Sequence, residues 1–282
     1  MNILVLGGVG QLGQCISKVA TQRGITSISF VDEFVGNILD MKVLENLFTQ
    51  EKPEYVINCA AYTAVDKAED EVELSRKINR DGAGNIAKMC IQFGATLLHV
   101  STDFVFEGNV PSLLNEDSST HPISMYGLTK LEGEKAITDL LPEYYIVRTA
   151  WLYSEFANNF MKTMIRLGTE RDSLGVIADQ IGSPTYGVDL ASALLDIIAS
   201  GKKNYGIYHY SNEGAISWYD FAKAIFELGN IEIKVKPLKT SEYPTKATRP
   251  AFSAMDKTKI KTTFGIEIPY WRDSLKVALL SL

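Results

Sequence analysis

Five short apolar runs in the first half of the chain alternate with longer segments in which apolar residues recur every three or four positions. Continuous apolar runs are typical of strands buried on both faces, and the wider spacing is typical of amphipathic helices. The pattern predicts strands at 2–7, 27–32, 54–60, 95–102 and 144–151, with helices at 11–24, 39–50, 73–94 and 125–140. Alternating strands and helices predict an α/β fold built on a doubly wound parallel sheet.

After about Tyr153 the alternation loosens. The later pattern predicts helices at 158–168, 187–200 and 217–229, strands at 205–211 and 231–238, and a turn-rich loop at 242–256. Ser217 is a suitable N-cap for the last of these helices. No repeat or flexible linker separates the two halves. We therefore expect residues 154–282 to form a smaller lobe packed closely on residues 1–153, with some segments returning to the sheet.

Composition narrows the class of protein. The 282 residues are 46% hydrophobic and carry a net charge of −6, which suits one large α/β domain or a domain with a smaller lobe. An acidic balance without a cluster of Lys and Arg argues against a nucleic-acid-binding surface. No apolar run reaches the roughly 18 residues of a membrane span, and the first residues do not resemble a signal peptide. We expect a cytoplasmic protein in which Cys15, Cys59 and Cys90 are reduced thiols.

The first predicted strand runs into "GGVGQLG", in which Gly7, Gly10 and Gly13 form a G-x-x-G-x-x-G pattern. Between a strand and a helix, the first glycine permits a tight turn and the second lets a pyrophosphate approach the backbone. The third lets the helix pack on the strand. The unpaired N–H groups at the helix N-terminus favour phosphate. The pattern predicts a dinucleotide site, and a tight turn without a ligand is the structural alternative.

Asp32 ends the second predicted strand, 25 residues after Gly7. A carboxylate at this place accepts hydrogen bonds from the adenosine ribose hydroxyls, whereas a 2′-phosphate would meet like charge. Because no Lys or Arg stands beside Asp32, the sequence favours NADH over NADPH as the cofactor. An acid that merely ends a strand is the alternative interpretation.

Two tyrosine–lysine pairs have the four-residue spacing that places both side chains on one face of a helix. Tyr126 and Lys130 follow a strand that ends in two hydroxyl residues, at the edge where ligands bind in open α/β sheets. Tyr219 and Lys223 lie in the C-terminal half, on a helix whose apolar residues are needed for its core face. Position in the chain therefore favours the first pair as a catalytic pair.

The hydroxyl of Thr102 completes a set suited to hydride transfer. A ketone that accepts hydride develops negative charge on its oxygen and then needs a proton. Tyr126 can supply that proton. Lys130 one turn away, together with the positive charge of an oxidised nicotinamide, favours the phenolate of a side chain whose reference pKa is about 10. Thr102 can donate a hydrogen bond that polarises the carbonyl. A nucleotide-binding protein that kept this set but lost turnover is the alternative.

These features together resemble the extended short-chain dehydrogenase/reductase superfamily. Within it, the sequence is similar to the dTDP-4-dehydrorhamnose reductase family in "GGVGQLG", "VINCAAYTAVDKAE", "STDFVFEG", "YGLTKLEGE", "NNFMKTM", "DQIGSPT" and "RPAFS". The resemblance implies a Rossmann-type dinucleotide-binding domain at 1–153 and a mainly substrate-binding lobe at 154–282. It also implies that NADH or NADPH reduces the C4 ketone of dTDP-4-dehydro-L-rhamnose to give dTDP-L-rhamnose, with Tyr126 as the proton donor.

The resemblance assigns roles to residues at matching positions. Thr102, Tyr126 and Lys130 would be catalytic, and the last two would also contact the cofactor. Other contacts to the cofactor would come from Gly10, Gln11, Leu12, Asn37, Ile38, Ala60, Ala61 and Tyr62. The sugar pocket would be lined by Val65, Thr102, Phe104, Tyr126 and Trp151. Arg249 would hold the nucleotide diphosphate, because Arg pairs well with phosphate, and a solvated loop cation is its alternative.

Two features depart from the family pattern. Phe104 stands where the family commonly has Tyr, so a hydroxyl beside the pocket is lost. Some members form dimers through a metal held by acidic residues, whereas here the first helix carries Gln14 and Cys15 and the chain ends "ALLSL". Because Mg²⁺ needs oxygen ligands, we expect no such metal site. The expected state is a monomer or a weak homodimer rather than a metal-bridged dimer.

Other functions stay open within the superfamily. Another nucleotide-sugar 4-ketoreductase would use the same residues, and an epimerase would keep its NAD tightly bound. A 4,6-dehydratase needs an acid–base carboxylate pair, whereas this chain offers Asp103 followed by Phe104. A non-catalytic regulatory subunit, like the related chains that regulate a methionine adenosyltransferase, is argued against by the intact catalytic set.

Overall fold

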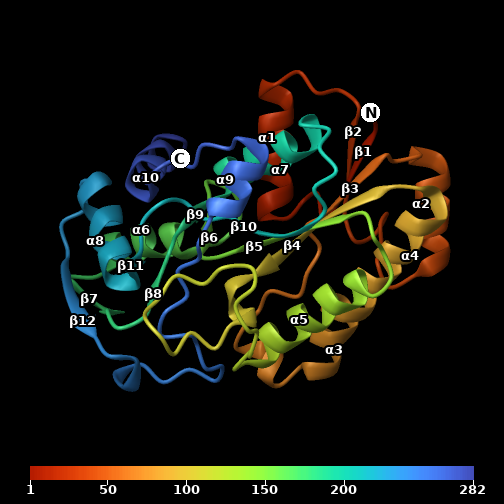
Figure 1. The fold of residues 1–282 in the computed structure, drawn as a ribbon. Coiled ribbons are helices and arrows are strands. Elements are labelled where there is room, and N and C mark those ends of the chain that lie inside the picture. Colours follow the sequence, from red (N-terminus) through yellow and green to blue (C-terminus); the bar gives the residue numbers. More distant parts are fainter.

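A six-stranded parallel sheet forms the centre of the computed structural model, which describes residues 1–282. Its strands follow the order β10-β5-β4-β3-β1-β2 (Figure 1). Their bounds are β1 (Ile3–Leu6), β2 (Ile28–Val31), β3 (Tyr55–Asn58), β4 (Thr96–Thr102), β5 (Tyr144–Thr149) and β10 (Gly206–His209). The direction of winding reverses between β1 and β3, and this topology places a crevice outside the carboxyl ends of those strands.

Helices cover both faces of the sheet, as the sequence predicted (Figure 1). On one face lie α1 (Gln11–Gln22) and α7 (Gly187–Ala199), and on the other lie α2 (Met41–Glu51), α4 (Ala83–Phe93) and α5 (Met125–Thr138). Alternate strand residues serve opposite layers, because Ile3 and Val5 pack toward α1 and α7 whereas Leu4 and Leu6 pack toward α2 and α4. This explains why the strands read as continuous apolar runs.

The helix predicted at 73–94 is interrupted. It consists of α3 (Val72–Arg76), a π-helical turn η2 (Lys77–Gly82) and α4. At the turn the backbone closely approaches α5, since a Cβ added to Gly133 would lie 2.1 Å from the carbonyl oxygen of Asn79. π-turns of this kind recur at functional sites, and the side chain of Asn79 in this one bonds to Tyr62 and Thr129.

The C-terminal lobe contains three helices and three two-stranded sheets. The helices are α6 (Phe160–Glu170), α8 (Trp218–Leu228) and α10 (Trp271–Leu280). The paired strands are β6 (Leu152–Tyr153) with β9 (Thr185–Tyr186), β7 (Ser173–Ile177) with β12 (Lys234–Leu238), and β8 (Ile181–Gly182) with β11 (Ile216–Ser217). Ser217 caps α8 as predicted, with Asp220 completing a capping box. Short 3-10 turns are η1 (Lys67–Glu69), η3 (Asp103–Val105) and η4 (Thr240–Glu242).

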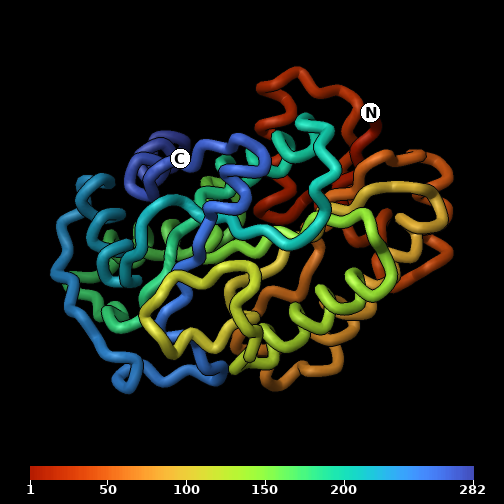
Figure 2. The backbone as a smooth tube through the Cα atoms, in the orientation of Figure 1, coloured from red at the N-terminus to blue at the C-terminus, as the bar shows by residue number.

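Two long loops join the lobe to the sheet domain. The loop after η4 returns along the loop that precedes α5 (Figure 2). Leu114 and Met255 pair there in a parallel bridge. The chain then forms α9 (Thr258–Phe264) beside β10. Both α9 and α10 lie outside the elements predicted from the sequence. No helix has the length and apolar character needed to cross a bilayer.

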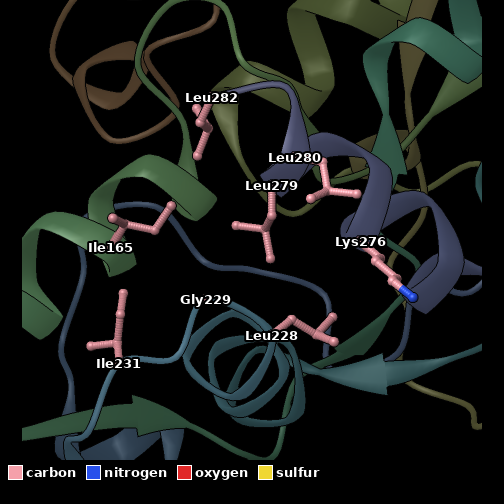
Figure 3. Close-up of a pocket in the computed structure, with 8 residues that line it drawn as sticks. All are labelled: Ile165, Leu228, Gly229, Ile231, Lys276, Leu279, Leu280 and Leu282. Atoms are coloured by element: carbon pink, nitrogen blue, oxygen red, sulfur yellow. The ribbon is translucent and has the colours of Figure 1, made fainter.

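An apolar groove of about 370 Å³ lies on the lobe between α6, α8 and α10 (Figure 3). Ile165, Leu228 and Leu279 line it, and Lys276 is its one charged residue. None of the predicted site residues lies in this groove.

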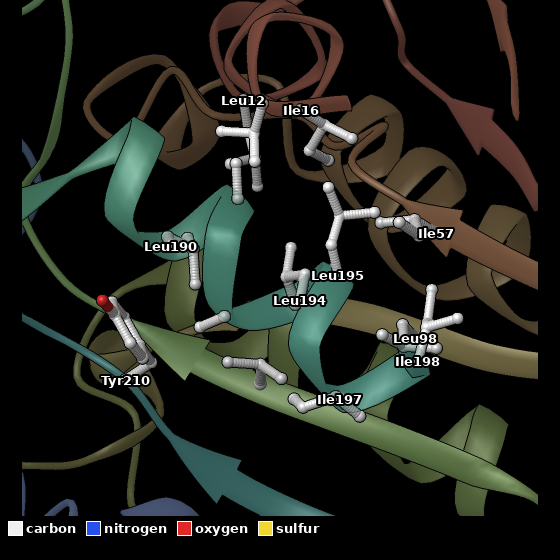
Figure 4. Close-up of a cluster of buried hydrophobic side chains, with 14 of the residues drawn as sticks. Leu12, Ile16, Ile57, Leu98, Leu190, Leu194, Leu195, Ile197, Ile198 and Tyr210 are labelled. Atoms are coloured by element: carbon white, nitrogen blue, oxygen red, sulfur yellow. The ribbon is translucent and has the colours of Figure 1, made fainter. Parts of the chain in front are cut away.

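The largest core cluster ties the second half of the chain to the first. Leu12 and Ile16 of α1 pack with Leu194 and Ile198 of α7 over the sheet (Figure 4). All four are less than 7% exposed. Burial of side chains of this size contributes roughly 1.5–3 kcal/mol each, so α7 belongs to the core of the sheet domain although it follows part of the lobe in sequence.

Candidate active site

The glycine loop brings β1, α1 and the end of β3 into close contact. Gly7 has a left-handed backbone (φ 75°), and a Cβ there would lie 2.7 Å from the backbone nitrogen of Ala60. A Cβ on Gly13 would lie 2.4 Å from the carbonyl oxygen of Gly8. Gly10 is the N-cap of α1, which has no side-chain cap and no acidic residue in its first turn. The open N–H groups and the helix dipole therefore fit an anion such as a pyrophosphate.

The end of β2 carries the predicted ribose-binding acid. One oxygen of Asp32, Oδ1, accepts hydrogen bonds from the backbone N–H groups of Phe34 and Val35, each at 3.0 Å. The neighbouring segment, residues 28–41, contains no Lys or Arg. Of the predicted adenine neighbours, Asn37 is exposed and Ile38 is buried beneath Gly82.

The segment after β3 is tied to α5 through Asn79. Its side-chain oxygen accepts a 2.9 Å bond from the backbone N–H of Tyr62, and its amide nitrogen donates to the hydroxyl of Thr129 at 3.0 Å. The segment begins with Ala60, whose N–H donates to Asn58 Oδ1 at 3.0 Å. The predicted cofactor residues Ala60, Ala61 and Tyr62 are thereby fixed beside α5.

Thr102 and Tyr126 meet where β4 ends and α5 begins. Thr102 Oγ1 accepts the backbone N–H of Phe104 at 3.2 Å and donates to Asp103 Oδ1 at 3.1 Å. The start of α5 lies directly against this turn, because a Cβ on Gly127 would be 2.2 Å from the carbonyl oxygen of Phe104. The rings of Phe104 and Tyr126 contact edge to face, with their centres 5.5 Å apart.

The local environment keeps Tyr126 protonated. Burial raises the pKa of its phenol to about 12, a hydrogen bond with Thr102 lowers it, and the nearby Asp103 carboxyl raises it. The sequence-based expectation was that Lys130, together with the charge of an oxidised nicotinamide, favours the phenolate. Burial is the dominant effect, and the Lys130 amine contacts Val100 and His99 instead of the phenol. A neutral phenol is the form that a proton donor requires.

Lys130 lies one turn further along α5 with its amine buried. Its Nζ donates to the carbonyl oxygen of Val100 at 2.7 Å and lies 3.3 Å from Nε2 of His99. Burial lowers the pKa of the amine to about 8, against the opposing charge of Glu134. Glu134 itself forms a buried ion pair with Arg148 at 2.7 Å.

Predicted substrate residues come from both halves of the chain. Trp151 has a left-handed backbone (φ 46°), which is rare for a bulky residue and clusters at functional sites. Its ring stacks on Trp218 of the lobe at 3.5 Å, and Val65 is half-buried after β3. Arg249 does not project freely, because its guanidinium makes bonds of 2.7 and 3.2 Å to the carboxylate of Asp66.

The other tyrosine–lysine pair lies on α8 in the lobe. Tyr219 is half-buried and Lys223 is exposed, and the residues of that helix that are buried are apolar. No group of three or more His, Cys, Asp or Glu side chains is arranged to hold a metal ion.

Three buried polar residues around α5 were not predicted from the sequence: Asn58, Asn79 and His99. Each is no more than 2% exposed. The available signal was a polar side chain inside an otherwise apolar stretch, "YVIN" for Asn58 and "LLHV" for His99, because buried polar groups need partners.

Comparison with known proteins finds similarity along the whole chain. The family profile described as RmlD substrate binding domain matches residues 1–282. A dTDP-4-dehydrorhamnose reductase of Aggregatibacter actinomycetemcomitans is 41% identical over 98% of this chain and 97% of its own length.

Solved structures agree with this finding. The crystal structure of a dTDP-4-dehydrorhamnose reductase from Clostridium acetobutylicum is similar with a TM-score of 0.95 and 43% identity, over 100% of both chains. A reductase of the same name from Bacillus anthracis, solved in complex with NADP, has a TM-score of 0.95 and 37% identity, again over 100% of both chains.

Proposed function

Because the chain belongs to the RmlD family, we propose that it reduces the C4 ketone of dTDP-4-dehydro-L-rhamnose to give dTDP-L-rhamnose. The observation that carries this proposal is a full-length match to such reductases in a chain that keeps Thr102, Tyr126 and Lys130 together at the sheet edge. The open N-terminus of α1 supports an NAD(P) cofactor.

In the proposed reaction, a bound reduced nicotinamide supplies a hydride to the carbonyl carbon. Thr102 orients and polarises the carbonyl through its hydroxyl. Tyr126 gives its phenolic proton to the carbonyl oxygen, and its raised pKa ensures that this proton is present at neutral pH. Lys130 restores the proton to Tyr126. Phe104 and the Trp151–Trp218 stack line the sugar side and exclude water.

We propose the same cofactor contacts as those expected from the sequence. Gly7, Gly10 and Gly13, with Gln11 and Leu12, would hold the pyrophosphate, and Asp32 the adenosine ribose. Asp32 keeps one carboxylate oxygen outside its two turn hydrogen bonds, and no nearby Lys or Arg would neutralise a 2′-phosphate. NADH is therefore the favoured donor. The division at residue 153, the monomeric or weakly dimeric state and the cytoplasmic location stay predictions.

One assay tests the proposal. Purified protein is mixed with enzymatically prepared dTDP-4-dehydro-L-rhamnose and either NADH or NADPH, and absorbance at the reduced-nicotinamide band is followed. We expect oxidation of both donors, with the higher kcat/KM for NADH. Tyr126→Phe removes the proton donor, so kcat should fall by at least about 10²-fold.

Tyr219→Phe is the matched control, because it removes the same hydroxyl from the second tyrosine–lysine pair and should leave turnover unchanged. No oxidation of either donor by the wild-type protein would refute the reductase. A faster reaction with NADPH would refute only the cofactor preference.

A further inference from the structure

A chain of three buried polar side chains runs from the cofactor-binding edge to the catalytic lysine. Asn58 ends β3, His99 lies within β4 and Lys130 lies on α5, and their exposed fractions are 1%, 1% and 2%. We propose that His99, oriented by Asn58, is a positioning residue that donates its Nε2–H toward the amine of Lys130 and so eases proton transfer from Lys130 to Tyr126. The proposal rests on the reductase function proposed above.

The bond between Ala60 and Asn58 fixes which atom donates and which accepts in the bonds between Asn58, His99 and Lys130. The backbone N–H of Ala60 can only donate, so the atom it meets at 3.0 Å is the amide oxygen of Asn58. The amide nitrogen then points the other way and donates to Nδ1 of His99 at 3.0 Å. A ring nitrogen that accepts carries no proton, so the neutral ring carries its proton on Nε2.

The protonated Nε2 faces Nζ of Lys130 at 3.3 Å. An ammonium group has only donors and cannot accept this N–H, whereas a neutral amine has a lone pair that can. The remaining contact of the amine, to the carbonyl oxygen of Val100 at 2.7 Å, is available to both forms. The arrangement therefore disfavours the charged form of Lys130 relative to a lysine without His99.

Other groups around the amine act in both directions. Burial is the dominant effect and lowers the pKa of Lys130 to about 8. Glu134 on α5 and, more weakly, Cys59 after β3 act in the opposite direction and raise it. Burial and the charge of Lys130 keep His99 neutral by lowering its pKa well below its usual value. The neutral ring required by the hydrogen-bond pattern is thus also the stable one.

The consequence is a proton relay tuned to neutral pH. After Tyr126 gives its proton to the product alkoxide, the resulting phenolate takes a proton from the ammonium of Lys130, and the neutral amine regains one from water. A donor whose proton affinity lies near the working pH transfers more readily than an unperturbed lysine. His99 would stabilise the neutral amine that exists between these two transfers.

The tautomer of His99 provides a test that does not depend on turnover. The chain has only three histidines, so ¹⁵N-histidine labelling gives a readable spectrum, and loss of signals in His99→Gln assigns this ring. We expect a neutral Nε2–H tautomer between about pH 5 and 9. An Nδ1–H tautomer or an imidazolium would overturn the proposal, even if the reductase activity is present.

The pH dependence of kcat provides the second test. His99→Leu removes the N–H, and Asn58→Asp supplies an acceptor in place of the amide donor, which places the His99 proton on Nδ1. Both changes should raise the proton affinity of Lys130 and move the alkaline limb of the kcat profile upward by about one pH unit. His99→Gln keeps an N–H near Lys130, so its limb should lie closer to that of the wild type.

His121→Leu is the matched control, because His121 is exposed and its loss should leave the limb in place. An unmoved limb in both His99→Leu and Asn58→Asp would overturn the proposal. If His99→Leu does not fold, the nearly isosteric Asn58→Asp decides alone. Failure of the reductase function itself would appear as no turnover in the wild type, with the tautomer measurement still readable.

Discussion

At Asp103 the chain buries a carboxyl group beside the tyrosine that would donate the proton. The side chain is 2% exposed, Oδ1 accepts a hydrogen bond from Thr102, and Oδ2 has no hydrogen-bond partner. Burial raises its pKa to about 6, although hydrogen bonds with Ser253 and Thr102 oppose the shift. A half-satisfied buried carboxyl destabilises the fold in its charged form, and sites of this kind are often functional.

The pH dependence of stability should reveal this group. Its folded-state pKa lies above the usual 3.8, so the folded protein binds the proton more tightly than the unfolded chain, and stability falls as pH rises from about 4 through 6. Asp103→Asn removes that loss. The free energy of unfolding of the variant relative to wild type should grow by up to about 3 kcal/mol between pH 4 and 7.

Urea unfolding at several pH values measures this difference. Asp117→Asn, which removes one charge from the exposed loop before α5, is the matched control. A constant difference between Asp103→Asn and wild type across this range would show that the carboxyl is no more easily protonated when folded than when unfolded.

At the scale of elements, close backbone approaches set the shape of the site. The loop after β1 lies so close to the end of β3 that a Cβ on Gly7 would overlap the backbone of Ala60. In the same way, a Cβ on Gly127 of α5 would overlap the backbone of η3. Such approaches need glycine because any larger side chain would overlap backbone atoms that cannot move aside. These glycines in the sequence therefore mark positions where the backbones of two elements lie in close contact.

Gly13→Ala should disrupt the dinucleotide site. The new Cβ would lie 2.4 Å from the carbonyl oxygen of Gly8, so α1 must shift away from the loop, at a cost of roughly 1–3 kcal/mol in stability. The affinity for NADH should fall on the order of ten-fold or more, as read by nicotinamide fluorescence.

Gly84→Ala is its matched control. That Cβ would meet only the methyl group of Ala136 at 3.5 Å, an ordinary contact between α4 and α5. The change should leave NADH affinity intact and stabilise the fold by about 0.5–1 kcal/mol, because alanine is the better helix former. Equal losses of affinity in both variants would contradict the role given to the loop.

At the scale of the whole molecule, the two halves are joined across the site. The pair between Asp66 and Arg249 connects residues 183 positions apart. The hydrogen bond that the Arg249 guanidinium donates to the carboxylate holds the pKa of Asp66 below its usual value. The stack of Trp151 on Trp218 makes a second connection. The sugar pocket proposed here therefore exists only when the lobe is docked.

Two variants separate the roles of Arg249. If it binds the diphosphate, Arg249→Met should raise KM for the nucleotide sugar roughly ten-fold or more with little change in KM for NADH. Asp66→Asn weakens the same pair but leaves the guanidinium available, so KM should stay near wild type. A similar rise in both variants would mean that Arg249 anchors its loop rather than the substrate.

The sequence by itself determined the features that depend on local spacing. Apolar runs specified the sheet strands, the glycine pattern specified a strand–turn–helix with an open N-terminus, and Tyr126 and Lys130 were marked by the strand that precedes them. These features are readable because each is set within one element or by the order of two consecutive elements along the chain. The same limit explains why the break in the helix at 73–94 was missed, since it depends on contact with Gly133.

Only the tertiary structure decided which polar groups meet. Asn58 and His99 are 41 positions apart, and His99 and Lys130 are 31 apart, so no local pattern could pair them. Burial then raised the pKa of Tyr126, which the spacing to Lys130 could not predict, because desolvation depends on everything packed around a group and not on one neighbour.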